Sequence, residues 1–301
     1  MKTRLNIFQN KSGKWLSVLA LIFLFSCRKD VTVELPNYQQ KIVIEGSIET
    51  GAPATVFLSY SVPYFGDFDY TSPQNAFIKG ATVIVSDGTT IDTLKELDPG
   101  LGYLYVGSKV IGQEGKTYVI KVNVGDESFS TSSTILNPVP LDSLYFERRN
   151  KTDIKDSLGY IGQKLKEPKG SGDCYRWLSK RIGRDVFYAA PFNSAFDDKF
   201  IDGQTFEFTY DRGRQPDPFV DSSTDPERGY YKVGDTVVVK FCKIGRKEYD
   251  FWVTYYQNKV SNGNPFSAPS NVKSMFDNYQ RCLGAFVAYS PSFDTIIIPA
   301  K

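Results

Sequence analysis

The sequence contains no histidine among its 301 residues. Without an imidazole group, the chain cannot form a Ser-His-Asp or Cys-His nucleophile system, and no histidine is available to bind zinc or iron. An excess of charge of either sign is also missing, because 36 Lys and Arg residues stand against 34 Asp and Glu residues. Nucleic-acid-binding proteins normally carry a clustered basic excess. The composition therefore excludes histidine-based catalysis and argues against a nucleic-acid partner.

Cysteine is scarce, and its four residues are widely spaced. Cys174, Cys242 and Cys282 match no compact Cys-x-x-Cys motif, and no glycine-rich phosphate motif follows a predicted strand, so we predict neither a metal nor a cofactor. Three thiols form at most one disulfide bond among themselves. Because each has aromatic or apolar neighbours in the sequence, we expect buried free thiols, with a single disulfide as the alternative.

The N-terminal residues carry the clearest pattern in the chain. Four basic residues and no acid lie between positions 2 and 14, and the apolar run 15–25 follows them. As a helix this run is about 16 Å long, which is too short for a hydrocarbon layer of about 30 Å. We therefore predict a signal peptide over residues 1–26 rather than a membrane span.

The end of this run resembles a bacterial lipobox. The residues are Leu24, Phe25, Ser26 and Cys27, of which Phe25 is bulkier than the residue usually found at its position. In a lipobox the peptidase cuts before the cysteine, so Cys27 becomes the first mature residue and carries acyl chains that anchor the protein to the membrane. The alternative is an ordinary signal peptide that contains a cysteine.

Residues 27–39 are predicted to be a polar tether. Arg28, Lys29 and Asp30 partly resemble the basic-then-acidic stretch that directs some Bacteroidota lipoproteins to the cell surface. The other interpretation is a solvated linker. We therefore expect a lipid anchor in the outer membrane, with the periplasmic and the surface face both open.

Short apolar runs separated by turn residues recur between positions 40 and 137. Gly51, the pair Asp87-Gly88 and the pair Gly125-Asp126 mark hairpin connections. We predict strands at 41–49, 54–61, 81–86, 89–94, 101–106, 117–124 and 127–135. Seven short strands in one such segment are typical of an immunoglobulin-like β-sandwich. The fold class predicted for the chain is accordingly mainly β.

Pro138 and Pro140 interrupt this rhythm, so a second β-rich domain of α+β type is predicted over residues 138–301. Its strand candidates are 141–148, 174–182, 204–210 and 236–243, and residues 211–230 are expected to form an irregular loop.

An amphipathic helix is predicted near residues 245–261. Five residues share one helical stripe, namely Tyr249, Trp252, Val253, Tyr256 and Val260. Asn262-Gly263 then ends the helix. The stripe either packs on the sheet through Trp252 and Tyr256 or forms a surface that stacks on a sugar or a partner.

Several acidic residues are candidate oxygen ligands for calcium. They are Asp197, Asp198, Asp202, Asp211, Asp217, Asp221, Asp225 and Glu227. Their spacing matches no calcium-loop motif, and solvated loops are the favoured explanation for them. Two carboxylates also suffice to hydrolyse a glycosidic bond, but no particular pair is singled out. The aromatic loop at 65–70 either stacks on a ligand or folds over the sandwich edge. We assign no catalytic or metal-binding residue, and the ligand stays unknown.

Some segments resemble a known family of lipoproteins. These are Val43-Ile44-Glu45-Gly46, the aromatic helix, the stretch 264–269, and Leu283-Gly284-Ala285-Phe286 with the strand to Tyr289. The family is named domain of unknown function 4249. The resemblance implies a Bacteroidota envelope protein, commonly encoded beside a TonB-dependent outer-membrane transporter, and it implies no enzymatic activity.

The function we expect is that of a lipid-anchored envelope lipoprotein, a non-catalytic binding or accessory subunit associated with a TonB-dependent transporter. The alternatives are an envelope glycan hydrolase that uses two carboxylates and an adhesin-like structural protein.

Overall fold

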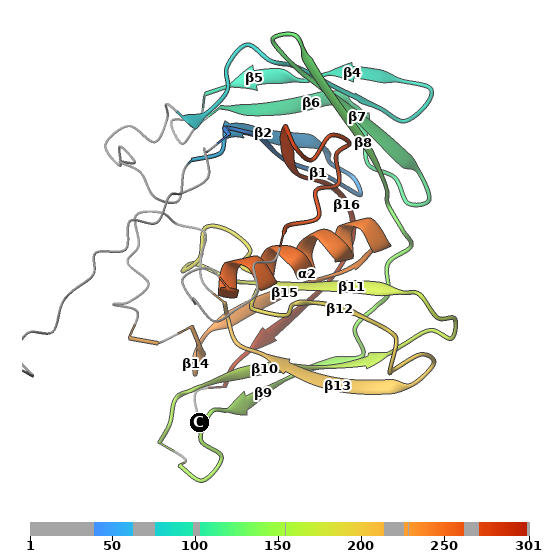
Figure 1. Ribbon diagram of the computed structural model, residues 1–301. Coiled ribbons are helices and arrows are strands. Elements are labelled where there is room, and N and C mark those ends of the chain that lie inside the picture. Colours follow the sequence, from blue (N-terminus) through green and yellow to red (C-terminus); the bar gives the residue numbers. More distant parts are fainter. Residues whose placement is uncertain are drawn as a thin grey trace, which may run out of the picture. The chain divides into compact units, whose positions relative to one another are not determined.

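Figure 1 shows the computed structural model, which describes residues 39–62, 76–98, 103–153, 155–213, 226–227, 229–261 and 271–299. Cys27, the predicted signal peptide and the aromatic loop at 65–70 lie outside the described residues, as does the stretch 264–269. Of the described residues, 52% lie in strands and 7% in helix, which confirms the mainly β fold class.

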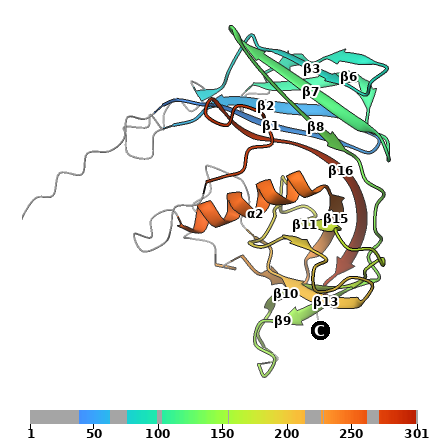
Figure 2. The same ribbon diagram turned by 45° about the vertical axis from the view of Figure 1, so that its right-hand side comes forward.

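The largest sheet has eight strands and includes strands from before and after residue 137. In spatial order they are β12 (Ala195–Asp197), β11 (Cys174–Arg181), β15 (Thr236–Ile244), β16 (Cys282–Ile297), β1 (Ile42–Glu49), β2 (Pro53–Tyr60), β6 (Leu104–Ile111) and β5 (Lys95–Leu97). The first half of β16 pairs parallel with β1, and its second half pairs antiparallel with β15. Figure 2 shows how strongly β16 curves between these two partners. The predicted domain boundary near residue 137 stays a prediction, and the sheet is continuous across it.

Two of the segments that carry the family resemblance are partners in this pairing. Ile44 lies opposite Gly284, and Gly46 lies opposite Phe286. A Cβ atom on Gly284 would lie 1.9 Å from the carbonyl oxygen of Ile44, and Gly284 has a φ of +132°. A Cβ atom on Gly46 would lie 2.8 Å from the Phe286 ring. Both glycines therefore allow β1 and β16 to approach each other closely.

The first hydrophobic core lies between the β1, β2 and β6 part of this sheet and a second sheet. The second sheet contains β4 (Ile91–Thr93), β3 (Thr82–Ser86), β7 (Thr117–Val124) and β8 (Glu127–Thr134). In β7 the side chains of Tyr118, Ile120 and Val122 are buried while those between them are exposed, as the alternation predicted. The immunoglobulin-like arrangement stays a prediction.

A third sheet covers the other end of the large sheet. It contains β13 (Thr205–Tyr210), β10 (Leu158–Lys166), β9 (Ser143–Arg148) and β14 (Tyr231–Lys232). Between it and strands β11 and β15 lies an aromatic core in which the Trp177 and Tyr210 rings are 5.0 Å apart and the Tyr175 and Phe241 rings are 5.3 Å apart. These rings supply much of the buried apolar area of this part of the chain.

Helix α2 (Arg246–Ser261) packs on the opposite face of β11, β12 and β16 (Figures 1 and 2). Phe251 is buried, and Tyr249 and Trp252 pack against the core beneath the helix. The helix packs on the sheet through Trp252 as predicted, but Tyr256 does not belong to this core, and Phe251 was not on the predicted stripe. Glu248 lies in the first turn and Lys259 in the last, where each charge suits the helix dipole. Among the described residues, no helix has the length and apolar character that a membrane span requires.

Most predicted strands coincide with observed ones, and the hairpins at Gly88 and Gly125 are confirmed, with φ values of +89° and +57°. The strand predicted at 101–106 is shifted, because β6 begins at Leu104 and continues to Ile111. The sequence pattern did not indicate β10, which carries glycine at positions 159 and 162.

Candidate functional site

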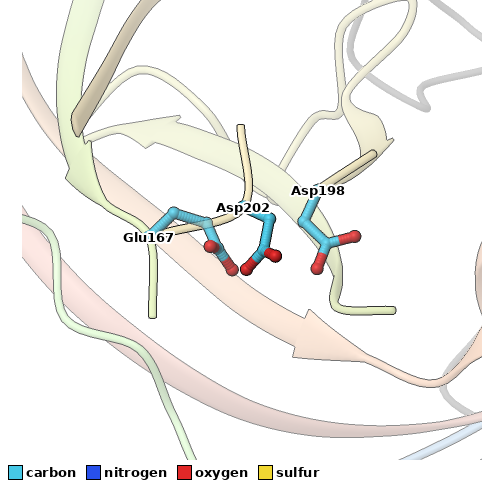
Figure 3. Close-up of side chains that lie close together, drawn as sticks. All are labelled: Glu167, Asp198 and Asp202. Carbon is cyan, nitrogen blue, oxygen red and sulfur yellow. The ribbon is translucent and has the colours of Figure 1, made fainter. Parts of the chain in front are cut away.

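The structure brings together two of the acidic residues that the sequence singled out. Asp198 and Asp202 lie beside Glu167, with the nearest carboxylate oxygens of the three within 4.8 Å of one another (Figure 3). Asp198 follows β12, Asp202 lies in the turn after it, and Glu167 follows β10. Glu167 was not predicted to belong to this group, because it lies on a different strand.

The three carboxylates accept hydrogen bonds from the chain itself. Asp198 accepts from the backbone N–H groups of Gly172 and Asp173 at 2.8 and 2.9 Å. Asp202 accepts from the Gly170 N–H at 2.7 Å, and Glu167 accepts from the Gly203 N–H at 2.6 Å. These bonds fix two neighbouring turns, so the cluster has a structural task. Its oxygens suit a hard cation, but calcium needs six to eight ligands.

The other predicted acidic residues do not join this cluster. Asp197 forms an ion pair with Arg246 at 3.0 Å, and burial raises the pKa of Asp211. Asp217, Asp221 and Asp225 lie outside the described residues. Of the sequence group Asp197, Asp198 and Asp202, the fold keeps the last two together and turns Asp197 to Arg246.

Glu227 belongs to a buried network of ion pairs. Arg181 binds Asp185 at 2.8 Å and Glu227 at 2.5 Å. Arg184 binds Glu227 at 2.6 Å and Asp235 at 2.7 Å. The network joins the end of β11 to the turn before β15 and holds two arginines against three carboxylates. Such a network is expected to stabilise the fold only as a complete set, because the removal of one partner leaves a buried charge unpaired.

Arg176 is a second buried cation, and it differs from Arg181 in its partners. It lies in β11 on the face that α2 covers, and 6% of its surface is exposed. Its guanidinium carbon lies 3.2 Å from the centre of the Trp252 ring, and one terminal nitrogen donates a hydrogen bond to the Tyr289 hydroxyl group. Among the described residues, no carboxylate lies within 4.0 Å of Arg176. Buried charges without an ionic partner are rare in folded proteins and mark candidate functional sites.

Two N–H donors at this stack have no acceptor. The Nε atom of Arg176 and the Nε1 atom of Trp252 are both buried, and neither has a hydrogen-bond partner among the described residues. Both groups can only donate. Two unsatisfied donors in one contact, beside a permanent positive charge, define a place where a hydrogen-bond acceptor is missing.

Lys240 adds a second cation to the same face of the sheet. Its Nζ atom lies 5.2 Å from the centre of the Tyr289 ring, and the guanidinium carbon of Arg176 lies 5.9 Å from that centre. Lys240 pairs with Glu49 at the end of β1. The ring of Tyr289 therefore lies between two buried cations, of which one has a carboxylate partner.

The three cysteines of the folded part are free and buried, as the sequence predicted. Burial raises the pKa of each thiol, Cys174, Cys242 and Cys282, to about 12. A thiol with such a pKa is almost entirely protonated at neutral pH, so none of the three is suited to act as a nucleophile or a metal ligand.

Sequence reasoning missed Arg176, although it singled out Trp252. In the sequence Arg176 alternates with Tyr175 and Trp177, which is the usual pattern of a strand with one solvated face. Only the position of α2 shows that this face is covered.

The described residues define a mainly β protein in which one helix covers a buried arginine. A family model matches residues 28–293. The chain belongs to this family, described as Domain of unknown function (DUF4249). No curated protein matches the chain.

Proposed function

We propose that the protein is a lipid-anchored lipoprotein of the cell envelope and acts as a non-catalytic binding or accessory subunit. The observation that carries the binding role is Arg176, a buried cation with no carboxylate partner among the described residues and with an unsatisfied N–H group. The lipid anchor is supported by the sequence Leu24-Phe25-Ser26-Cys27, which follows a basic segment and a short apolar run. With acyl chains on Cys27, the folded part is held at the membrane.

The anchor is tested by labelling with radioactive palmitate. We expect the parent protein to incorporate the label, the Cys27→Ser variant to lose it, and the matched Cys282→Ser variant to keep it. We also expect Cys27→Ser to leave the membrane fraction. A parent protein without label, or a Cys27→Ser variant that stays with the envelope like the parent, would contradict the proposal.

We propose the outer membrane as the location, with a TonB-dependent transporter as the partner. The family membership supports this proposal. Resemblance to this family implies a protein that is commonly encoded beside such a transporter. Extraction of envelopes with mild detergents, followed by mass spectrometry of co-purifying proteins, is the test. A protein that emerges alone under every extraction condition would contradict the transporter as partner.

The carboxylate cluster favours a second candidate, an envelope glycan hydrolase. Glu167, Asp198 and Asp202 lie at the short separation that a retaining hydrolase needs, which is about 5 Å. Their hydrogen bonds to backbone N–H groups argue for a structural role instead. Turnover of a glycan that disappears in the Asp202→Asn variant would favour the hydrolase over the binding subunit.

A further inference from the structure

We infer that Arg176 and Trp252 form a recognition site for the carboxylate group of a small organic ligand. The inference rests on the proposed binding role and deepens it, and it does not depend on the proposed lipid anchor. Three observations carry it: the missing acceptor, the uncompensated charge and the aromatic surroundings.

The missing acceptor determines the kind of atom that binds. Arg176 Nε–H and Trp252 Nε1–H both require an acceptor, and they belong to two side chains in direct contact, with the guanidinium carbon 3.2 Å from the centre of the Trp252 ring. An oxyanion satisfies such donors better than a neutral carbonyl group does, because a charge-assisted hydrogen bond is about twice as strong as a neutral one. The planar guanidinium group also matches the two oxygens of a carboxylate.

The surrounding charges favour an anion as well. Glu49 is paired with Lys240, so it does not compensate Arg176. Glu45 lies on the same face of β1 as Glu49, is exposed to solvent and forms no ion pair within the described part of the chain. No other carboxylate of the described residues is paired with Arg176 or Lys240. Of the two buried cations, Arg176 is therefore the one that no ion pair within the described residues neutralises.

The aromatic surroundings indicate what the rest of the ligand is like. Trp252 contacts Tyr255 and Tyr256, with ring centres 5.8 and 6.3 Å apart. Phe192 lies edge-on against Tyr256 at 6.3 Å, and 51% of Phe192 is exposed. Tyr255 is also partly exposed. A flat or apolar body attached to the carboxylate can stack on these rings, so the site suits an organic acid better than a bare inorganic ion.

Because the unsatisfied nitrogen atoms are closed off from solvent, the Trp252 ring must shift when an oxygen binds to them. Binding is therefore expected to change the fluorescence of Trp252. Trp177 lies in the other core and serves as an internal reference, since its ring is packed against Tyr210 on the opposite face of β11.

The test uses calorimetry and tryptophan fluorescence on the full-length protein in detergent. The probes are benzoate and glucuronate, with benzamide and glucose as their uncharged counterparts and inorganic phosphate as a bare anion. We expect saturable binding of at least one carboxylate, with its uncharged counterpart and phosphate at least tenfold weaker. If neither carboxylate binds saturably, or if the charged and uncharged probes bind equally, the inference is wrong.

Variants distinguish recognition from a purely structural role. Arg176→Met is expected to abolish carboxylate binding, while Lys180→Met, on the same strand and the same face, is expected to leave it unchanged. Trp252→Phe keeps an aromatic ring but lacks the N–H donor, so we expect severalfold weaker binding from a folded protein. If Arg176→Met does not fold, Trp252→Phe decides. Unchanged affinity in Trp252→Phe or in a folded Arg176→Met variant overturns the inference, whatever the result for palmitate on Cys27.

Discussion

Gly284 lies directly opposite Ile44 where β16 meets β1, so closely that a Cβ atom on Gly284 would lie 1.9 Å from the Ile44 carbonyl oxygen. No small movement of a side chain removes this overlap, because the obstructing atom belongs to the backbone. Gly284→Ala is therefore expected to separate the two strands at the centre of the largest sheet.

The first prediction concerns this variant. We expect Gly284→Ala to lower the free energy of unfolding by about 3 kcal/mol or more, from the overlap and from the positive φ together. Gly115→Ala is the matched control, because Gly115 also has a positive φ, +78°, but has open space around it. Its cost should be about 1 kcal/mol, from the backbone conformation alone. Urea denaturation of both variants measures the difference, and equal losses would refute the role of close approach.

A second prediction concerns Asp92, a buried residue of β4. Its Oδ2 atom accepts hydrogen bonds from three successive N–H groups of β6, those of Ser108, Lys109 and Val110, at 2.6, 2.6 and 3.1 Å. We expect Asp92→Ala to cost about 3 kcal/mol, because three buried donors lose their acceptor. Thermal or urea unfolding measures this cost. A loss below about 1 kcal/mol would mean that water replaces the carboxylate.

The lowered pKa of Asp92 also makes the stability of the folded protein depend on pH. Burial acts to raise the pKa of its carboxyl group, but the three backbone hydrogen bonds together lower it below the ordinary value. A lowered pKa means that the carboxylate stabilises the folded protein above the ordinary pKa of an aspartate. This stabilisation is lost as the pH falls through the lowered pKa. The stability difference between the parent and Asp92→Ala should therefore shrink in acid, and a difference that stays constant from neutral pH down to pH 2 would contradict this.

Glu248 is expected to show the opposite dependence. It is buried and bonded to the Ser133 hydroxyl group, and burial raises its pKa from the ordinary 4.5. Because the folded state retains the proton, its contribution to stability is greatest at low pH and falls as the pH rises from about 4.5 through the raised pKa. Glu248→Gln should remove this fall and be at least as stable as the parent at pH 7. The exposed Glu114→Gln is the control, and unfolding curves at several pH values decide.

The cysteines give a prediction about reactivity. Cys174, Cys242 and Cys282 are buried, with pKa values raised to about 12, so the folded protein should react with thiol reagents only very slowly at pH 7. In denaturant all three should react at once. Rapid modification of any of them under native conditions, read by mass spectrometry, would show that local opening exposes that strand.

The sequence predicts a structural feature well when the residues that determine it are close together in the chain. The hairpins at Gly88 and Gly125 were predictable because a short turn that contains glycine fixes the pairing of its neighbours. The parallel pairing of β1 with β16 was not, because nothing near Ile44 in the sequence refers to Gly284. Strand β10 escaped prediction because glycine lowers β propensity, although here Gly162 leaves room for the Tyr145 ring, which a Cβ atom would approach to 2.2 Å.

The same limit applies to the candidate sites. Asp198 and Asp202 are close in the sequence and were predicted together, whereas Glu167 reaches them from another strand. Arg176 reads as an ordinary strand residue until α2 is placed over it. Packing between segments that are distant in the chain decides which charged side chains are buried. The amino-acid composition does not indicate this packing.

The position of β16 also sets an order of events during synthesis. Because β1 is the first and β16 the last of the described strands to be made, the parallel neighbour of β1 does not exist until all the described strands between them have been made. Until then the backbone N–H and C=O groups along that edge of β1 are unpaired and can form hydrogen bonds with a strand of another chain. The growing chain would need to be shielded along this edge, and chains that stop short of Cys282 would be prone to aggregate.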